Sequence, residues 1–261
     1  MKRTSTLTIL SVLLFLLMAG MAMAAPLTVN DTYWGGSPNS STYANRDVIG
    51  EAKYFDISKA VISLAGTWLT LDIYTNFAGR ADDKLFFNYT KDPYTGAKTG
   101  IGYGDLFLAS EWKPYGDSPY SGDDHSTGTK WAYGFALDNR WSETGGTGHL
   151  YSLAGANVFL TGDFMTGGAI WRDGQEVGVD TRGLTSIRTG SWAVADDHIR
   201  FAFNIGGTTL LSGHEIAFHW GQTCGNDVIE GKVAVPEPAS LLLLGFGLLG
   251  IASLKRKLKN R

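Results

Sequence analysis

Apolar and polar residues alternate with a period of two along much of the chain. In TWLTLDIYT, residues 67–75, the side chains of Leu69, Leu71 and Ile73 fall on one face of an extended strand, and mostly polar side chains fall on the other. The stretches HIRFAFNI (198–205) and EIAFHW (215–220) repeat the pattern. This period predicts half-buried β-strands, because an amphipathic helix would space its apolar residues three or four apart.

Shorter stretches extend the same prediction over the rest of the chain. Strands are expected in KYFDI, KAVISL, DLFLAS, KWAYGFALD, HLYSLAG, NVFLTG and SIRTGSWAVA. In WRDGQEV, Asp173-Gly174 stands between two such runs, which is typical of a two-residue hairpin.

The pattern of many short strands, glycine-rich turns and no long amphipathic helix predicts an all-β fold. Alternation with one polar face favours antiparallel pairing. We expect an antiparallel β-sandwich, jelly-roll-like in topology. An immunoglobulin-like sandwich is the alternative, although the chain lacks the Cys…Trp…Cys spacing of that fold.

The first 24 residues have the organisation of a signal peptide. Lys2 and Arg3 precede an apolar run from Leu7 to Ala19, and the small residues Ala22 and Ala24 offer a cleavage site. Signal peptidase is therefore an expected partner, with cleavage after Ala24 or Ala25. The body, residues 25–235, is long enough for one domain with a sizeable core.

The last residues predict a membrane helix. No charge occurs from Ala239 to Leu254, which are 16 residues or about 24 Å of helix. That length is at the short limit for a spanning segment. A basic cluster follows and predicts a stop-transfer signal with the body outside the cytoplasm; it comprises Lys255, Arg256, Lys257, Lys259 and Arg261.

The order VPEPAS, apolar run and KRKLKNR resembles the PEP-CTERM sorting signal of bacterial exported proteins, with Pro236, Glu237 and Pro238 as its motif. The resemblance implies that residues 236–261 form the sorting signal. It implies an exosortase, a membrane-embedded cysteine protease-transpeptidase, as partner. It also implies a Gram-negative host that makes exopolysaccharide. The expected location is an inner-membrane intermediate, followed by the cell surface or the extracellular matrix.

The body resembles a recurrent exported ectodomain of such proteins. The resemblance is carried by YWGG (33–36), DVIG (47–50), GDLFL (104–108) and CGNDVIEG (224–231). It implies no catalytic assignment.

Charge and cysteine content narrow the function classes. The whole chain has 22 Lys+Arg and 25 Asp+Glu; without the seven basic residues and one acidic residue of the two ends, the body carries a net −9. An acidic body lacks the electrostatic footprint of a nucleic-acid-binding protein. The single cysteine, Cys224, excludes an internal disulfide, and we expect a buried, inert thiol.

No catalytic motif occurs in the sequence. His214 and His219 are five residues apart, so neighbouring positions on one metal are excluded on a strand or a helix. The glutamates are scattered. We therefore expect no enzyme. The alternative is an envelope enzyme acting on polysaccharide, a glycoside hydrolase or lyase, which would need two carboxylates brought together by folding.

Residues 111–141 combine aromatic side chains with aspartates, a composition that suits stacking on sugar rings. The candidate glycan-binding residues are Trp112, Tyr115, Tyr120 and Trp141. The simpler interpretation, which the alternation favours, places Trp131, Tyr133 and Phe135 on a core face and makes 113–129 a solvated loop.

Within the same stretch, SGDDHSTG offers Asp123 and Asp124 as candidate calcium ligands. A solvated acidic turn is the favoured alternative, because the stretch has no recognised calcium spacing. No other cofactor is expected. The sequence thus predicts an exported surface or matrix protein that is structural, adhesive or glycan-binding and associates with exopolysaccharide.

Overall fold

The strands of the domain run the length of the described chain. A computed structural model describes residues 25–82, 84–153 and 157–235. The strands are β1 (Leu27–Asn30), β2 (Ile57–Ala65), β3 (Trp68–Thr75), β4 (Leu106–Ala109), β5 (Tyr133–Leu137), β6 (Gly145–Ser152), β7 (Val158–Leu160), β8 (Glu176–Val179), β9 (Arg188–Val194), β10 (His198–Asn204), β11 (Glu215–Gly221) and β12 (Val228–Ala234). The helices are short: α2 (Ala52–Phe55), α3 (Thr161–Phe164) and the 3₁₀ turns η2 (Ser41–Tyr43), η3 (Phe87–Tyr89) and η4 (Thr209–Leu211).

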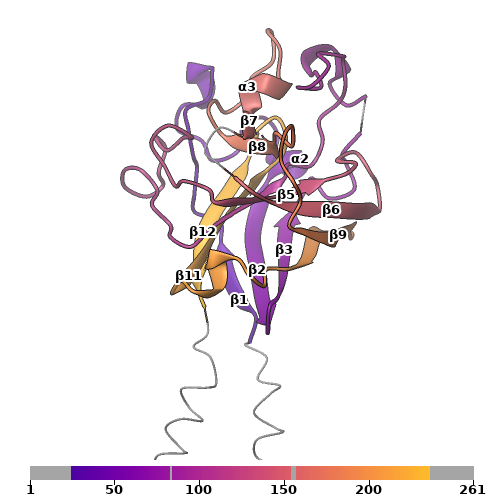
Figure 1. The fold of residues 1–261 in the computed structure, drawn as a ribbon. Coiled ribbons are helices and arrows are strands. Elements are labelled where there is room, and N and C mark those ends of the chain that lie inside the picture. The colour runs from indigo at the N-terminus through magenta and orange to yellow at the C-terminus, as the bar shows by residue number, and fades with distance from the viewer. Residues whose placement is uncertain (1–24, 83, 154–156, 236–261) are drawn as a thin grey trace, which may run out of the picture. The chain divides into compact units, whose positions relative to one another are not determined.

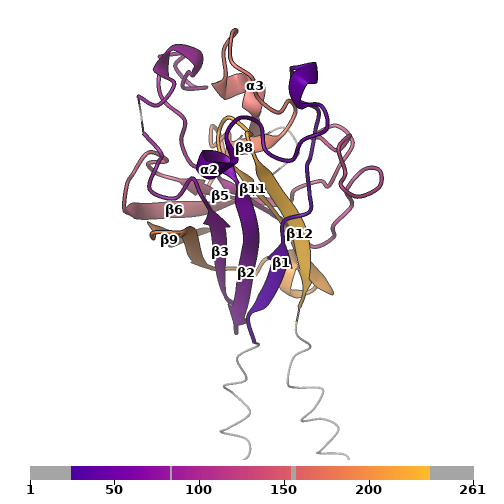
Figure 2. The same cartoon turned by 180° about the vertical axis from the view of Figure 1, so that it is seen from behind.

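Ten strands form one antiparallel sheet in the order β1-β2-β3-β10-β9-β6-β5-β4-β11-β12. The sheet curls until its two edge strands, β1 and β12, lie side by side, as Figures 1 and 2 show from opposite directions. The predicted all-β, antiparallel class is confirmed.

The predicted arrangement of two sheets differs from the structure, in which one nearly closed sheet wraps a shared core. Neighbours in this sheet are mostly neighbours in the chain, so the strand order does not establish a jelly roll. Alternation fixes which side of a strand is buried but not which strand it pairs with, and this is why the finer topology was not predictable.

The inner face of the sheet carries the core that the alternation predicted. Leu69, Leu71 and Ile73 of β3 and Phe201 and Phe203 of β10 are all buried in one apolar cluster. β2, β4, β5, β11 and β12 add side chains to the same cluster. The period-two pattern therefore locates the core correctly.

Two local predictions were wrong. KYFDI was expected to be a strand, but Ala52–Phe55 form helix α2, and the strand begins at Ile57. Asp173-Gly174 do form a turn, yet the flanking segments pair elsewhere: Arg172 bridges to Pro38, and β8 pairs with β7. In both places tertiary partners override the local signal.

A second, two-stranded sheet of β7 and β8 covers part of the outer face of the large sheet. β8 packs over β4, β5 and β11, and a second apolar cluster fills the space with Phe107, Ala109, Ala217 and Val179. The outer face of these strands is therefore buried as well, which their alternation did not predict.

Asp105 of the GDLFL stretch holds this small sheet in place. Its Oδ2 accepts hydrogen bonds from the backbone N–H of Val179 (2.7 Å) and from Nη2 of Arg140 (3.1 Å). Its Oδ1 accepts from the N–H of Leu137 on β5 (3.0 Å). One buried, charge-balanced carboxylate thus joins the two sheets.

Cys224 is buried with a free thiol, as predicted, and burial raises its pKa to about 12. Such a thiol is inert at neutral pH because the thiolate is the reactive form. In 25–82, 84–153 and 157–235, no helix is long and apolar enough to cross a membrane. The predicted signal peptide and membrane helix lie outside these residues.

Candidate functional site

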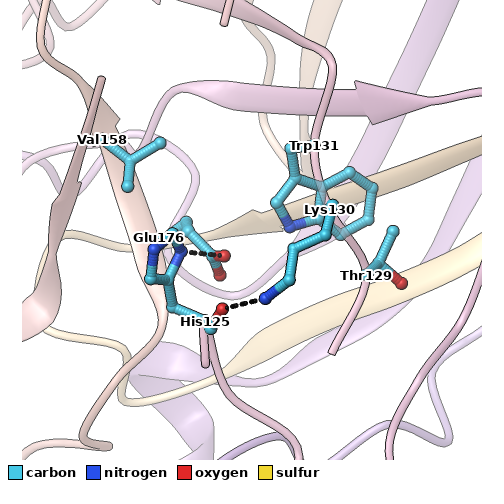
Figure 3. Close-up of a pocket in the computed structure, with 6 residues that line it drawn as sticks. All are labelled: His125, Thr129, Lys130, Trp131, Val158 and Glu176. Carbon is cyan, nitrogen blue, oxygen red and sulfur yellow. Dashed lines mark hydrogen bonds and ion pairs between the residues drawn. The ribbon is translucent and has the colours of Figure 1, made fainter. Parts of the chain in front are cut away.

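A pocket opens on the outer face of the large sheet, beside β8. It is lined by His125, Thr129, Lys130, Trp131, Val158 and Glu176, which Figure 3 shows from one side. About 270 Å³ of empty space lies within it, part of it open to solvent. Because this figure includes open solvent, the enclosed space is well below the range of about 300–1,000 Å³ for sites that bury a drug-sized ligand, and the pocket is a small indentation of the surface.

The walls of the pocket combine an aromatic side chain with charged groups. Nδ1 of His125 lies 2.8 Å from Oε1 of Glu176, and Nζ of Lys130 donates to the backbone oxygens of His125 (2.6 Å) and Ser126 (3.3 Å). An ammonium has three donors, so one N–H of Lys130 is left for a ligand. The hydrogen bond to Glu176 raises the pKa of His125 above its ordinary value, which favours the imidazolium.

Beneath the pocket, Glu230 receives a set of donors. Its Oε1 accepts from Nε1 of Trp112 (2.7 Å) and from Oγ1 of Thr129 (3.0 Å), and its Oε2 lies 3.3 Å from Nδ1 of His219. Nε2 of His219 donates to the backbone oxygen of Glu176 (2.9 Å). We call this set, with the pocket pair His125–Glu176 and with Tyr33 and Asp123 described below, the pocket network.

The sheet register explains why His219 and Glu230 meet. The two residues are cross-strand partners in the pairing of β11 with β12, and both lie on the outer face, opposite Phe218 and Trp220. Because β8 covers that face, both side chains are buried. A buried charge needs such a partner to be tolerated.

Tyr33 and Asp123 complete the network. The Tyr33 hydroxyl donates to Oδ2 of Asp123 (3.0 Å), and Nε2 of Gln175 donates to the Asp123 backbone oxygen (3.0 Å). Burial, and next the charge of Glu230, raise the pKa of Asp123 to about 6. Burial also raises the pKa of the Tyr33 hydroxyl well above its usual range.

His219 titrates in the same environment. Burial opposes a charge on the ring, but the hydrogen bond and charge of Glu230 together raise the pKa of His219 above its ordinary value. Glu230 therefore favours the charged form of the His219 ring more than burial opposes it.

Two of the four sequence-predicted aromatic residues, Trp112 and Tyr120, contact members of the pocket network. The rings of Trp112 and Tyr120 are 5.5 Å apart, edge to face, and Tyr120 lies 6.0 Å from Tyr33. Tyr115, with 57% of its surface exposed, is the most open large hydrophobic side chain of the described residues. Tyr120 has φ of +59°, a conformation that bulky residues rarely adopt and that often marks functional segments.

The fourth residue, Trp141, is placed differently. Its Nε1 donates to the backbone oxygen of Gly100 (2.9 Å), on another segment. Trp131, which the simpler interpretation assigned to a core face, is buried and forms a wall of the pocket. Residues 111–141 therefore form neither an exposed aromatic surface nor only a solvated loop.

Asp123 and Asp124 are not brought together as joint ligands. Asp123 faces the buried Tyr33 hydroxyl, whereas Oδ1 of Asp124 accepts from the backbone and hydroxyl groups of Ser126 and Thr127. Despite partial burial, these hydrogen bonds lower the pKa of Asp124. Asp124 thus caps a turn, in line with the favoured alternative.

Sequence reasoning missed Tyr33, Glu176, His219 and Glu230 as parts of one site. They come from four segments between residues 33 and 230, and no spacing links them. The one available signal was that Tyr33 lies in YWGG and Glu230 in CGNDVIEG, two of the stretches that carry the resemblance of the body.

The predicted terminal sites, Ala22, Ala24, the Pro236–Pro238 motif and the basic cluster, lie outside the described residues. A family model described as the PEP-CTERM protein-sorting motif matches residues 234–257. No curated protein and no solved structure matches the chain.

Proposed function

We propose a function for the body of this chain, which is a PEP-CTERM sorting-domain protein. The body is a non-catalytic surface or matrix module that binds polysaccharide. The motif implies exosortase-dependent sorting to the cell surface. A surface protein meets the polymers of the envelope, and the pocket on the outer face is the part of the body that suits a sugar.

One observation carries the proposal: an aromatic wall and charged hydrogen-bonding groups converge in one small pocket on the outer face of the sheet. Trp131 offers apolar contact, while Lys130 and the His125–Glu176 pair offer donors and an acceptor for hydroxyl groups. Carbohydrate sites combine these two features, because a sugar ring has an apolar face and polar edges.

The aromatic residues beside the pocket extend the surface. Trp112 and Thr129 donate to the same oxygen of Glu230, so the Trp112–Tyr120 pair and the pocket are tied to one buried carboxylate. In the proposed complex, polar groups of one sugar unit contact the pocket, and the continuing chain crosses the aromatic segment that holds Trp112, Tyr115 and Tyr120.

The carboxylates beneath the pocket favour binding over catalysis. Both oxygens of Glu230 contact donors of the protein, and Oε1 of Glu176 contacts His125. A general acid or nucleophile must reach the substrate. Carboxylates engaged in this way serve to position the pocket residues.

The first test is whether the protein binds polysaccharide at all. A glycan array and a pull-down with the host's exopolysaccharide, using purified full-length protein, should show saturable binding that free polysaccharide competes away. Absence of binding to every polymer in both assays would overturn the proposal.

The second candidate function is hydrolysis or lyase cleavage of polysaccharide, favoured by the raised pKa of Asp123, about 6, beside Glu230. Carboxyl groups whose protonation differs near neutral pH can act as acid and base. Incubation with exopolysaccharide should then release reducing or unsaturated ends, and Asp123→Asn should abolish the release. Unchanged polymer length would leave binding as the function.

Sorting itself has a separate test. Exosortase processing predicts that the mature surface protein ends near Val235–Ala239, which mass spectrometry of the exported product can measure. A mature extracellular protein that retains Arg261 would contradict this prediction.

A further inference from the structure

Three aspartates meet where the first strand ends and the last strand begins. Asp31 follows β1, Asp227 precedes β12, and Asp47 lies in the segment before α2. One carboxylate oxygen from each lies within 4.8 Å of the other two. Because β1 and β12 are adjacent, as Figure 2 shows, this aspartate cluster joins the two ends of the domain.

Two oxygens in the aspartate cluster are buried without a hydrogen-bond partner among the described residues, Oδ2 of Asp31 and Oδ1 of Asp47. Asp227 is fully buried, and its two oxygens accept from the N–H groups of Ile57 (2.6 Å) and Val228 (3.0 Å). Unsatisfied buried carboxylate oxygens are costly, so they point to a missing partner.

The nearest arginine does not supply that partner. Arg172 is buried, but its guanidinium donates to the backbone oxygens of Gly35 (2.8 Å), Gly36 (3.2 Å), Arg46 (3.3 Å) and Asp47. No ion pair of the described residues includes a carboxylate of the cluster. Arg172 therefore acts on the three carboxylates through its charge but forms no ion pair with them, which leaves a place for a cation among them.

YWGG is built around this guanidinium. Gly36 has φ of +20°, and a Cβ there would lie 2.4 Å from the Asp173 backbone oxygen. Only glycine lets the chain bring both carbonyls of Gly35 and Gly36 onto Arg172. Nη1 and Nη2 of Arg172 are therefore engaged by backbone oxygens, Nε has no hydrogen-bond partner among the described residues, and the aspartates have no ion pair with this guanidinium.

We propose that Asp31, Asp47 and Asp227 bind one calcium ion, which ties the beginning of the domain to its last strand. Calcium prefers carboxylate and carbonyl oxygens at about 2.3–2.6 Å, so oxygens on one ion can be up to about 5 Å apart. The separation within the cluster meets this limit. Extracellular calcium modules bind with dissociation constants of about 10⁻⁴–10⁻³ M, a range suited to an exported protein.

The electrostatics of the cluster support the same site. Burial, and next the charge of Asp47, raise the pKa of Asp31, and burial and the charge of Asp31 raise that of Asp227. A calcium ion among the three carboxylates would supply the positive charge that the cluster lacks.

Calorimetry and thermal melts of purified full-length protein, stripped with chelator, test the site with calcium chloride as the probe. The parent should bind one calcium ion and melt at higher temperature in its presence, because a ligand of the folded state stabilises it by mass action. Asp47→Asn and Asp31→Asn should bind calcium about tenfold or more weakly. Asp124→Asn, in the turn of Ser126 and Thr127, is the matched control and should bind as the parent does.

Each other outcome contradicts the proposal. A parent that shows neither heat nor a melting shift overturns the site. So does an Asp47→Asn variant that binds calcium as the parent does, or a loss confined to Asp124→Asn. An equal response to magnesium chloride overturns the assignment to calcium, since magnesium requires a tighter octahedral shell.

Discussion

The domain contains two buried acidic regions that balance their charge in different ways. In the pocket network, Glu230 and Glu176 each contact a histidine, and Trp112, Thr129 and Tyr33 add donors. In the aspartate cluster, no carboxylate has an ion-pair partner among the described residues, and two oxygens have no hydrogen bond.

The two regions differ in whether their carboxylates have histidine partners, although Oδ1 of Asp123 in the pocket network is also buried without a hydrogen-bond partner among the described residues. Where protein donors contact Glu230 and Glu176, the side chains that line the pocket are held in place without a ligand, which suits a pocket that binds and releases polysaccharide. A cluster with excess negative charge must take up protons or a cation. Substitutions in the two regions should therefore have opposite effects on stability.

The largest effect is expected from Glu230→Ala in the pocket network. This change leaves His219, Trp112 and Thr129 without their acceptor in a buried place. Removing one partner of a buried ion pair costs about 3–5 kcal/mol, so the free energy of unfolding should fall by that amount. Urea unfolding of the purified protein measures it.

The control for this variant is Glu51→Ala, which removes an exposed pair with Lys53. Exposed pairs contribute about 0–1 kcal/mol. If the two variants unfold at the same urea concentration, the pocket network does not stabilise the fold, and the predicted difference between it and the aspartate cluster is contradicted.

The opposite sign is expected from Asp31→Asn in the aspartate cluster. Without calcium, the amide removes one of three mutually repelling charges and keeps an oxygen for the Tyr33 N–H. The free energy of unfolding should rise by ~1 kcal/mol, the scale of an ordinary single substitution. Melting temperature in chelator reports it, at about 2–4 °C per kcal/mol for a domain of this size.

In calcium the parent should have a higher melting temperature than Asp31→Asn, the reverse of the order in chelator, because only the parent keeps all three carboxylate ligands. A variant that melts below the parent in chelator would show that the cluster is not a region of excess charge.

A further predicted effect is a dependence on pH between about 5 and 8. Asp123 has a folded pKa of about 6 against 3.8 for the ordinary group, so it binds more protons in the folded state. Its contribution to stability is present at low pH and is lost as the pH rises through about 6. The raised pKa values of His219, Asp31 and Asp227 act in the same direction.

Without calcium, the melting temperature should therefore fall as the pH rises over this range. Saturating calcium should reduce the fall, because the ion replaces protons on the aspartates but not on Asp123 or His219. A melting temperature that rises from about pH 5 to 8 in chelator would contradict the sign of these shifts.

The two faces of the sheet differ in what the sequence could predict. The inner face was predictable, because alternation alone places Leu71 and Phe201 in the core. The buried part of the outer face was not predictable from the sequence. His219 and Glu230 are buried there because β8 packs over them, and β8 reaches this position through a long connection in the chain. The terminal sorting motif was predictable because its parts are contiguous.

The four stretches that carry the resemblance of the body each contribute a residue to a buried polar contact in the structure. YWGG supplies Tyr33 to the pocket network, GDLFL supplies Asp105 to the junction of the sheets, and DVIG and CGNDVIEG supply Asp47 and Asp227 to the cluster. Their short patterns carry no spacing that reveals these meetings.

The most direct measurement is retention in gels that contain exopolysaccharide, with and without calcium, for the parent and three variants. Lys130→Ala and Tyr115→Ala should lose retention with melting temperature and calcium response unchanged, because Lys130 lines the pocket and Tyr115 is an exposed aromatic residue of the same stretch. Trp68→Ala, at an exposed tryptophan of β3, should migrate like the parent. If both Lys130→Ala and Tyr115→Ala are retained like the parent, the pocket is not the polysaccharide site.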